Sequence, residues 1–542
     1  LDLSPDFRLA EDAILQNLRE EAANQVIEEF YYQADPAFLE LVELLSNPRD
    51  DRKLVKTMYD LHEFILSHPF PETWLKEKLT LYDESALPQE SAFGKAILSY
   101  AVQALDYAIF LNRDAIHAVA KDSALEAAYF PSLKKDQELA EELKAAVHER
   151  RWDALREVLC QMKFCTLGRP KGTYDKELAQ QIKRRRELFK KILSGLKERQ
   201  LLGNSEDYRR DILELQPKVK ALFSLVSAFE RCFSEKKREK NFLDFSDLEH
   251  FALRLLIVEQ GGGVLATPLA LELRARYVEI MVDEYQDTNA TQDLLFFALS
   301  QNGQNLFTVG DVKQSIYRFR LARPELFMEK YDTYSREESS HQMIELQQNF
   351  RSRASVLTCI NDIFYQIMTK NLGGIRYTEE TALYPGAAFE ETEKKAGIPV
   401  QFLVADTGTE AFKQLDEEAA DYTARELEAK MIAEQIKSFT DEKNGLYVWD
   451  KDGQSYRKAC YKDMVILLRS MCGWSEVFVN VLMNEGIPAT AQTRTGYFAT
   501  AEVETVLSLL SVIDNPMQDI PMAAVLRSPM VGMTDDEMAW MI

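Results

Sequence analysis

The sequence is poor in cysteine and histidine, the residues that hold zinc and iron–sulfur centres or cross-link small domains. Its 542 residues include six cysteines and six histidines. No two cysteines form a CxxC pair, and the histidines do not cluster near them. This spacing argues against a zinc or iron–sulfur centre. Scattered thiols without a disulfide framework are typical of a reducing compartment, so we expect a cytoplasmic protein.

Long apolar runs and a secretory leader are missing as well. No run approaches the roughly 20 residues that span a bilayer. The opening stretch, LDLSPDFRLAED, is polar and acidic, unlike a signal peptide. We therefore expect no membrane partner. The chain starts with leucine rather than methionine, which suggests a processed product or a fragment.

The sequence also lacks a net positive charge. The formal net charge is −23, which by itself argues against a protein that binds nucleic acid. A basic groove can nevertheless exist on an acidic body. The two basic runs are QIKRRRELFKK (181–191) and EKKREK (235–240). Each is either a solvated helix face or a DNA contact, and the pattern alone leaves both readings open.

The hydrophobic pattern divides the chain into a helical half and an α/β half. The length fits about three or four domains of roughly 150 residues. Residues 1–240 carry apolar residues at helical spacing. Beyond residue 240, strands alternate with helices, which predicts parallel sheets covered by helices. A capping box at Ser246 and Glu249 predicts a helix start there. The predicted strands are YVEIMV, NLFTVG, QMIEL, PVQFLV and MVILL, and the continuous apolar ones fit sheets buried on both faces.

Two adjacent carboxylates end the strand in VEIMVDEYQDTNATQ (278–292). Ligands of open α/β sheets lie beyond the carboxyl ends of the strands, where Asp283 and Glu284 stand. One carboxylate could hold Mg²⁺. The other could orient and deprotonate a water that attacks a phosphate. The alternative is an ordinary polar strand end that leads into a helix.

A second strand runs into Gly310 in LFTVGDVKQSIYRFRLARPELF (306–327). The glycine permits a tight turn, and Gln314 could sense a phosphate or the attacking water. Aromatic residues then alternate with arginines, a composition typical of a platform for single-stranded nucleic acid. The alternative is ordinary packing. The four residues of this platform are Tyr317, Arg318, Phe319 and Arg320.

A third stretch, IELQQNFRSRASV, places Arg351 between a strand and a helix. An arginine there could reach a γ-phosphate from a second domain and stabilise transition-state charge. The alternative is a surface arginine in a salt bridge.

Together, VDEYQDT, VGDVKQSIYRFR and QQNFRS resemble motifs II, III and IV of UvrD/RecB-type superfamily 1 DNA helicases. The sequences of these motifs resemble those of the AddA/RexA-type family of ATP-dependent helicase/nucleases more closely. DFSDLEHFAL and TGYFATAEV look like accessory motifs of that family. The resemblance implies RecA-like P-loop NTPase lobes with a large all-helical insertion domain. The implied domains are the insertion (1–240), the second part of the first lobe (241–345), the first part of the second lobe (346–515) and the start of a second auxiliary helical domain (516–542).

The resemblance also implies roles for matching residues. Asp283 resembles the Mg²⁺ ligand, Glu284 the catalytic base, Gln314 the γ-phosphate contact and Arg351 an arginine finger. Gln286, with Asp287, completes motif II and couples it to neighbouring loops, and Tyr317 and Phe319 fall where the family stacks DNA bases. The implied cofactors are ATP and Mg²⁺. The implied partners are single-stranded and duplex DNA ends and a second helicase/nuclease subunit of AddB/RexB type, in double-strand-break repair.

The phosphate-binding loop GxxxxGK[ST] is absent from the 542 residues, and so is any nuclease motif. We therefore expect a fragment that does not hydrolyse ATP alone. Two alternatives remain: a plain UvrD/PcrA-type helicase, or a catalytically inactive DNA-binding scaffold subunit of a nuclease complex.

Overall fold

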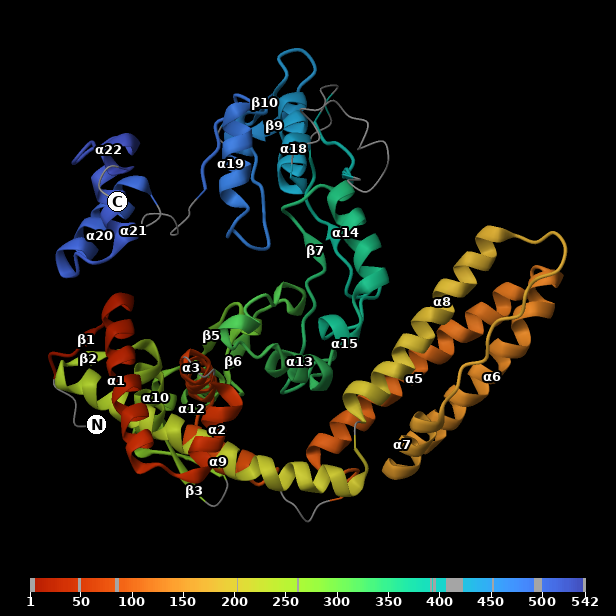
Figure 1. Ribbon diagram of the computed structural model, residues 1–542, viewed down its shortest axis with the longest axis horizontal. Coiled ribbons are helices and arrows are strands. Elements are labelled where there is room, and N and C mark those ends of the chain that lie inside the picture. The colour runs from red at the N-terminus through yellow and green to blue at the C-terminus, as the bar shows by residue number, and fades with distance from the viewer. Residues whose placement is uncertain are drawn as a thin grey trace. The chain divides into compact units, whose positions relative to one another are not determined.

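The computed structural model describes residues 5–46, 50–82, 87–201, 203–260, 263–389, 392, 396–405, 423–450, 453–491 and 500–539. The chain divides into two compact units, Leu1–Met343 and Ile344–Ile542 (Figure 1). Within the described residues, no helix combines the length and apolar character needed to cross a membrane.

The first unit begins with helices that share one core. These are α1 (Asp12–Gln33), α2 (Pro36–Leu45), α3 (Arg52–Leu66), α4 (Pro71–Leu79) and the later part of α9 (Ser205–Glu239). Large side chains from several of them, including Phe38, Met58 and Phe229, are fully buried together. Burial of each such side chain stabilises the fold by about 1.5–3 kcal/mol.

A second helical group has cores of its own. It consists of α5 (Ala92–Val119), α6 (Ser123–His148), α7 (Trp152–Gln161), α8 (Lys176–Gly195) and the π-helix η1 (Leu196–Gln200). The long helix α5 packs against both α6 and α8 (Figure 1). Leu105, Leu143 and Phe189 lie in one core of this group, and Tyr129 and Ile182 lie in the other.

The two ends of the helical half meet in one small sheet. Strand β1 (Arg8–Leu9) pairs in parallel with β2 (Phe242–Leu243). The end of α9 is fixed at the same place, because the buried ammonium of Lys237 lies 2.7 Å from a carboxylate oxygen of both Asp244 and Asp247.

The helix predicted to begin at Ser246 begins earlier. Helix α10 (Phe245–Leu256) is capped by Asp244, whose carboxylate accepts the Asp247 N–H at 2.8 Å. The Asp247 carboxylate accepts the Asp244 N–H in return at 2.9 Å. The capping box at Ser246 and Glu249 is therefore wrong. The sequence offers two overlapping cap patterns, and the aspartate pair also binds Lys237.

The remaining elements of the first unit alternate between helices and short strands. They are β3 (Ile257–Gln260), β4 (Gly263–Ala266), α11 (Pro268–Arg276), β5 (Ile280–Val282), η2 (Tyr285–Asp287), α12 (Ala290–Leu299), β6 (Leu306–Thr308), η3 (Val312–Gln314), η4 (Arg318–Arg320) and α13 (Pro324–Thr333). β3 and β4 are antiparallel, whereas β5 and β6 are parallel. Leu253, Ala270 and Ala298 join α10, α11 and α12 in one core.

The strands β5 and β6 form as predicted, but they are not buried on both faces. Met281 and Phe307 are partners in the register and are 72% and 54% exposed. Because paired residues lie on the same face of a sheet, one apolar face of this two-stranded sheet is left uncovered in the described chain.

The second unit contains β7 (Gln348–Asn349), α14 (Ala354–Ile367), α15 (Lys370–Gly373), β8 (Tyr384–Pro385), α18 (Ala424–Thr440), β9 (Tyr447–Asp450), β10 (Ser455–Lys458), η5 (Tyr461–Asp463), α19 (Ser475–Asn484), α20 (Ala501–Asp514), α21 (Asp519–Arg527) and α22 (Asp535–Ala539). The strands predicted at QMIEL, PVQFLV and MVILL do not form in the described residues. Leu346, Phe402 and Leu467 of these stretches are exposed, so no burial favours pairing there. The described fold is thus mixed α/β, with small two-stranded sheets.

Candidate functional site

The ends of β5 and β6 lie side by side. Val282 pairs with Thr308, and the Val309 N–H donates to the Val282 carbonyl at 2.8 Å. The Tyr285 N–H then donates to the Val309 carbonyl at 2.9 Å. Because the strands are parallel, both predicted motifs leave the sheet at the same edge. The structure therefore brings the acidic pair and the Gly310 turn together.

The backbone turns sharply at Glu284. This residue has φ 49° and ψ 42°, a left-handed conformation that is uncommon for a residue other than glycine. The Asp283 carboxylate accepts the Glu284 N–H at 2.9 Å and supports the turn. Such strain costs about 1–3 kcal/mol and persists only where the surroundings hold it, typically at functional sites. Both carboxylates are exposed.

Gln286 connects the two motifs through its side chain. It is 1% exposed. Its amide nitrogen donates to the Glu284 carboxylate at 2.6 Å, and its amide oxygen accepts the Asp311 N–H at 2.9 Å. A carboxylate can only accept and an N–H can only donate, so these partners determine the orientation of the amide. Gln286 thereby fixes the position of the Glu284 side chain.

Gly310 is required by a close approach rather than by an unusual turn. It is not among the glycines with positive φ. A Cβ atom at this position would lie 2.5 Å from the Gln286 side-chain oxygen. The sequence interpretation, in which glycine supplies conformational freedom, is therefore wrong. Glycine is needed because the Gln286 amide fills the space that a side chain would occupy.

Gln314 joins the same hydrogen-bonded network. Its amide donates to the Asp311 carboxylate at 3.1 Å. The other oxygen of that carboxylate accepts from Lys313, through both the backbone N–H at 3.0 Å and the ammonium at 2.9 Å. Glu284, Gln286, Asp311 and Gln314 thus form one continuous chain of hydrogen bonds across the strand ends.

The acidic cluster has a polar atom that lacks a protein partner. One carboxylate oxygen of Asp287 is buried and accepts no hydrogen bond in the described part of the chain. Burial, together with the nearby Glu284 carboxylate, raises the pKa of Asp287 above its ordinary value. Described residues contain no group of three or more metal-ligating side chains. A Mg²⁺ ion held by one or two carboxylates, waters and phosphates needs no such group, so the residues fit this ion.

The aromatic–arginine stretch forms an exposed cluster. The Tyr317 and Phe319 ring centroids lie 5.8 Å apart, and Phe319 is 73% exposed. The Arg320 guanidinium lies 5.1 Å from the Tyr317 ring and 5.7 Å from the Phe319 ring. Arg318 instead forms an ion pair with Glu325. Two flat faces and one cation are therefore presented together, and the second cation is neutralised.

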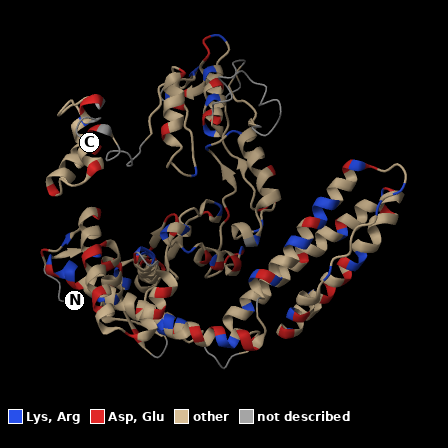
Figure 2. Cartoon of the chain, viewed as in Figure 1, with Lys and Arg blue, Asp and Glu red and all other residues tan. Residues whose placement is uncertain are grey.

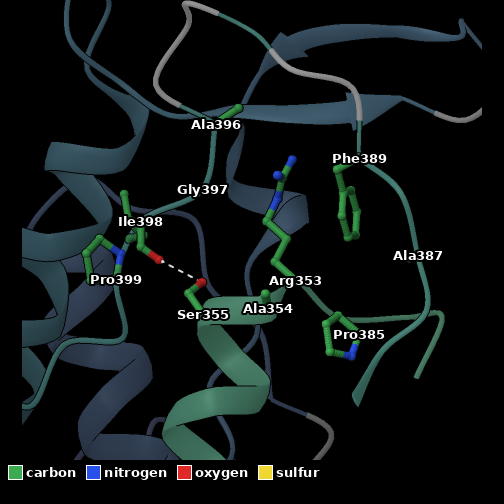
Figure 3. Close-up of a pocket in the computed structure, with 10 residues that line it drawn as sticks. All are labelled: Arg353, Ala354, Ser355, Pro385, Ala387, Phe389, Ala396, Gly397, Ile398 and Pro399. Atoms are coloured by element: carbon green, nitrogen blue, oxygen red, sulfur yellow. Dashed lines mark hydrogen bonds between the residues drawn. The ribbon is translucent and has the colours of Figure 1, made fainter. Parts of the chain in front are cut away.

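Arg351 belongs to the second unit, where it is exposed. Its N–H donates to the Asn349 side-chain oxygen at 2.9 Å, which places it between β7 and α14 as the sequence predicts. A pocket of about 530 Å³ lies beside the start of α14 (Figure 3). Its lining includes Arg353, which lies 4.3 Å from the Phe389 ring and donates to the Tyr456 hydroxyl at 3.1 Å. No sequence pattern marked Arg353, because its two partners lie far along the chain.

The basic run on α8 is divided by its surroundings. Figure 2 shows Lys and Arg along this helix. Arg186 is 3% exposed and donates to both carboxylate oxygens of Asp136 and to the Cys165 carbonyl. Arg185 forms an ion pair with Asp114 at 2.8 Å. Arg184 remains exposed. The three arginines therefore do not act as one surface.

Two protein-family models match the regions of the chain that contain these motifs. Residues 40–335 match the UvrD/REP helicase N-terminal domain, and residues 344–541 match the UvrD-like helicase C-terminal domain. The accessory stretch TGYFATAEV lies largely outside the described residues.

Curated relatives match along nearly the whole chain. The sequence is 38% identical to the A subunit of an ATP-dependent helicase/nuclease from Lachnoclostridium phytofermentans, over 100% of this chain and 41% of that protein. It is 37% identical to the protein of the same name from Acetivibrio thermocellus, over 99% of this chain and 45% of that protein. The chain thus spans less than half the length of these relatives. The resemblance drawn from the motifs is confirmed, and the chain belongs to the UvrD/Rep helicase family.

Proposed function

We propose that this chain forms part of an ATP-driven DNA helicase and translocase. In the intact protein, it would act as the AddA/RexA-type subunit of a helicase/nuclease on single-stranded and duplex DNA ends in double-strand-break repair. The observation that carries the proposal is the hydrogen-bonded network of Glu284, Gln286, Asp311 and Gln314 at the joined strand ends. The shared name of the relatives supports the helicase/nuclease assignment.

In this proposal the network hydrolyses ATP. Asp283 would hold Mg²⁺, which when bound would neutralise charge on the phosphates. The Glu284 carboxylate, fixed by Gln286, takes a proton from the attacking water. Gln314 exchanges its bond to Asp311 for the γ-phosphate. By its resemblance to an arginine finger, Arg351 would stabilise the charge that develops on the transferred phosphoryl group.

In this proposal, single-stranded DNA binds to the exposed cluster of Tyr317, Phe319 and Arg320. Stacking of a base on an aromatic ring contributes about 1–3 kcal/mol and tolerates any sequence. Arg320, already placed over both rings, adds charge for the phosphates. Arg318 would contribute only after leaving its ion pair with Glu325.

The domain assignments from the sequence support this function. We propose that residues 1–240 are a helical insertion of the first lobe, because parallel pairing of β1 with β2 joins the two ends of the helical half. Residues 241–345 would complete the lobe that carries Asp283. Residues 346–515 would form the first part of the second lobe, and residues 516–542 would begin the second auxiliary helical domain.

The partners follow from the same reasoning. The relatives' name designates one lettered component of a complex, which implies a further component in those proteins. We propose that this protein forms a heterodimer with a second helicase/nuclease subunit of AddB/RexB type in the cytoplasm. A plain UvrD/PcrA-type helicase is the alternative within the family. The intact network argues against an inactive scaffold, since a dead site has no need of an aligned Glu284.

Strand displacement tests the proposal. The complete gene product that contains residues 1–542, with its partner subunit, should unwind a blunt-ended duplex only when ATP and Mg²⁺ are present. The polypeptide 1–542 alone should bind single-stranded DNA but show no ATP turnover, because its sequence contains no GxxxxGK[ST] loop. ATP turnover by that polypeptide would refute the second statement, and a complete protein without ATP-dependent unwinding would refute the first.

A further inference from the structure

Tyr285 anchors the strained turn at Glu284. Its side chain is fully buried, and its hydroxyl donates to the Asp293 carboxylate on α12. Its ring lies 6.4 Å from the Phe296 ring and 6.0 Å from the Phe327 ring. Glu284 immediately precedes this buried residue, so a displacement of the Tyr285 main chain would also displace the turn at Glu284.

Helix α13 packs directly on this anchor. Phe327 of α13 contacts the Tyr285 ring, and the Lys330 ammonium lies 5.2 Å from the centroid of that ring. The N–H of Arg323, which precedes α13, donates to the Thr288 carbonyl at 2.9 Å. Both the start and the middle of α13 are thus attached to the segment that follows the acidic pair.

The first turn of α13 is also attached to the aromatic cluster. Glu325 forms an ion pair with Arg318, which stands between Tyr317 and Phe319 in the sequence. The ten-residue helix therefore contacts the DNA-binding cluster through Glu325 and the turn of the catalytic base through Phe327. A short helix moves as a rigid element, so displacement of one contact is passed to the other.

We propose that α13 transmits the presence of single-stranded DNA on Tyr317 and Phe319 to the position of Glu284, with Glu325, Phe327 and Tyr285 as positioning residues. This inference rests on the function proposed above. Stacking of a base on the cluster displaces Arg318 and its partner Glu325. The displacement carries α13 with it, and Phe327 then shifts Tyr285 and the adjacent left-handed turn.

The test compares ATP hydrolysis by the complete gene product with and without saturating oligo(dT). Saturation removes any effect of a changed DNA affinity of Arg318. Glu325→Gln should lower the stimulation by DNA about 3- to 10-fold, in the range of measured coupling effects, and leave the rate without DNA unchanged. Glu329→Gln is the matched control. It makes the same change one turn along α13, where the side chain is exposed and has no ion pair in the described chain.

The same measurement of stimulation by DNA is made on a second variant, Phe327→Leu, and on the double variant with Glu325→Gln. If both residues act through one helix, the double variant should lose no more stimulation than the more damaged single variant. Losses that multiply, or a Glu325→Gln protein that matches Glu329→Gln, would overturn the inference. If the unmodified protein shows no stimulation by DNA at all, the proposed function fails and the inference falls with it. Thermal unfolding of each variant excludes a folding defect as the cause.

Discussion

The side-chain amide of Gln286 donates to the Glu284 carboxylate at 2.6 Å. The same side chain accepts the Asp311 N–H from the neighbouring strand end. One buried residue therefore fixes the orientation of an exposed carboxylate and joins β5 to β6 beyond their last paired residues. Removal of either hydrogen bond would leave a polar group near Gln286 without its partner.

Replacement of Gln286 by glutamate should impair catalysis without changing the size of the side chain. The Asp311 N–H keeps an acceptor, but the second carboxylate now faces Glu284, and like charges raise the pKa of one of the two groups. We expect the DNA-stimulated ATPase rate to fall by about 10- to 100-fold, since a misplaced general base loses much of its contribution. The acid limb of the pH–rate profile should move to higher pH. Gln304→Glu, at an exposed position before β6, is the control. A rate equal to that control would argue against the bridging role.

Gly310→Ala should displace the Gln286 side chain. The added Cβ would lie 2.5 Å from the Gln286 amide oxygen and 3.3 Å from two backbone nitrogens, so the structure must shift. Such overpacking costs about 1–3 kcal/mol, measurable as a lower midpoint of denaturant unfolding. Gly195→Ala in α8, where no atom lies within 4 Å of the added Cβ, should not destabilise the protein. Equal stability of the two variants would contradict the steric account.

The buried ion pair of Arg186 and Asp136 should be essential for the helical group. Arg186→Ala leaves the Asp136 carboxylate buried without a counter-ion, which costs about 3–5 kcal/mol. Arg184→Ala, two positions earlier on the exposed face, should be neutral. Urea unfolding monitored by far-ultraviolet circular dichroism measures both. If Arg184→Ala is the more destabilising of the two, the assignment of Arg186 as the structural residue is wrong.

The pair of His62 and Glu230 should contribute to acid sensitivity. Burial alone would raise the pKa of Glu230, but the hydrogen bonds from His62 and Ser234 and the charges of His62 and Lys237 together outweigh it, so this pKa lies below its ordinary value of 4.5. A lowered pKa in the folded state means that the carboxylate stabilises the fold fully above pH 4.5 and loses this effect as pH falls through the lowered value. The stability difference between the wild type and Glu230→Gln should therefore shrink below pH 4.5. Glu235→Gln, exposed on the same helix, is the control, and a difference that grows on acidification would contradict the sign.

The position of the candidate site in the first unit could be predicted because its residues lie in contiguous stretches. A strand that ends in Asp283-Glu284 and another that ends at Gly310 must meet if the strands are parallel neighbours, and the register confirms this. For Gln286, the sequence predicts only that it couples motif II to neighbouring loops, and not which groups it contacts. Its two partners are set by the close approach at Gly310, which no spacing rule describes.

Other features could not be predicted, since they depend on contacts between distant residues. Arg186 reads as one of three surface arginines until Asp136, 50 positions away, is placed beside it. The apolar residues of QMIEL, PVQFLV and MVILL predict strands, but strands form only where neighbours pair with them. In the described residues these stretches form no strand, and Gln342 makes an isolated bridge with Ser335. The exposure of Met281 and Phe307 likewise depends on what covers the sheet, not on the strands themselves.

The most direct test of the whole account is the ATPase rate of Glu284→Gln. The measurement uses the complete gene product with saturating single-stranded DNA and Mg²⁺, beside the wild type and beside Glu279→Gln as a matched control before the strand. If Glu284 is the base, its substitution should lower the rate by about 10²- to 10⁴-fold while a fluorescent ATP analogue still binds. Wild-type turnover by Glu284→Gln would contradict the central claim that the joined ends of β5 and β6 form the catalytic site.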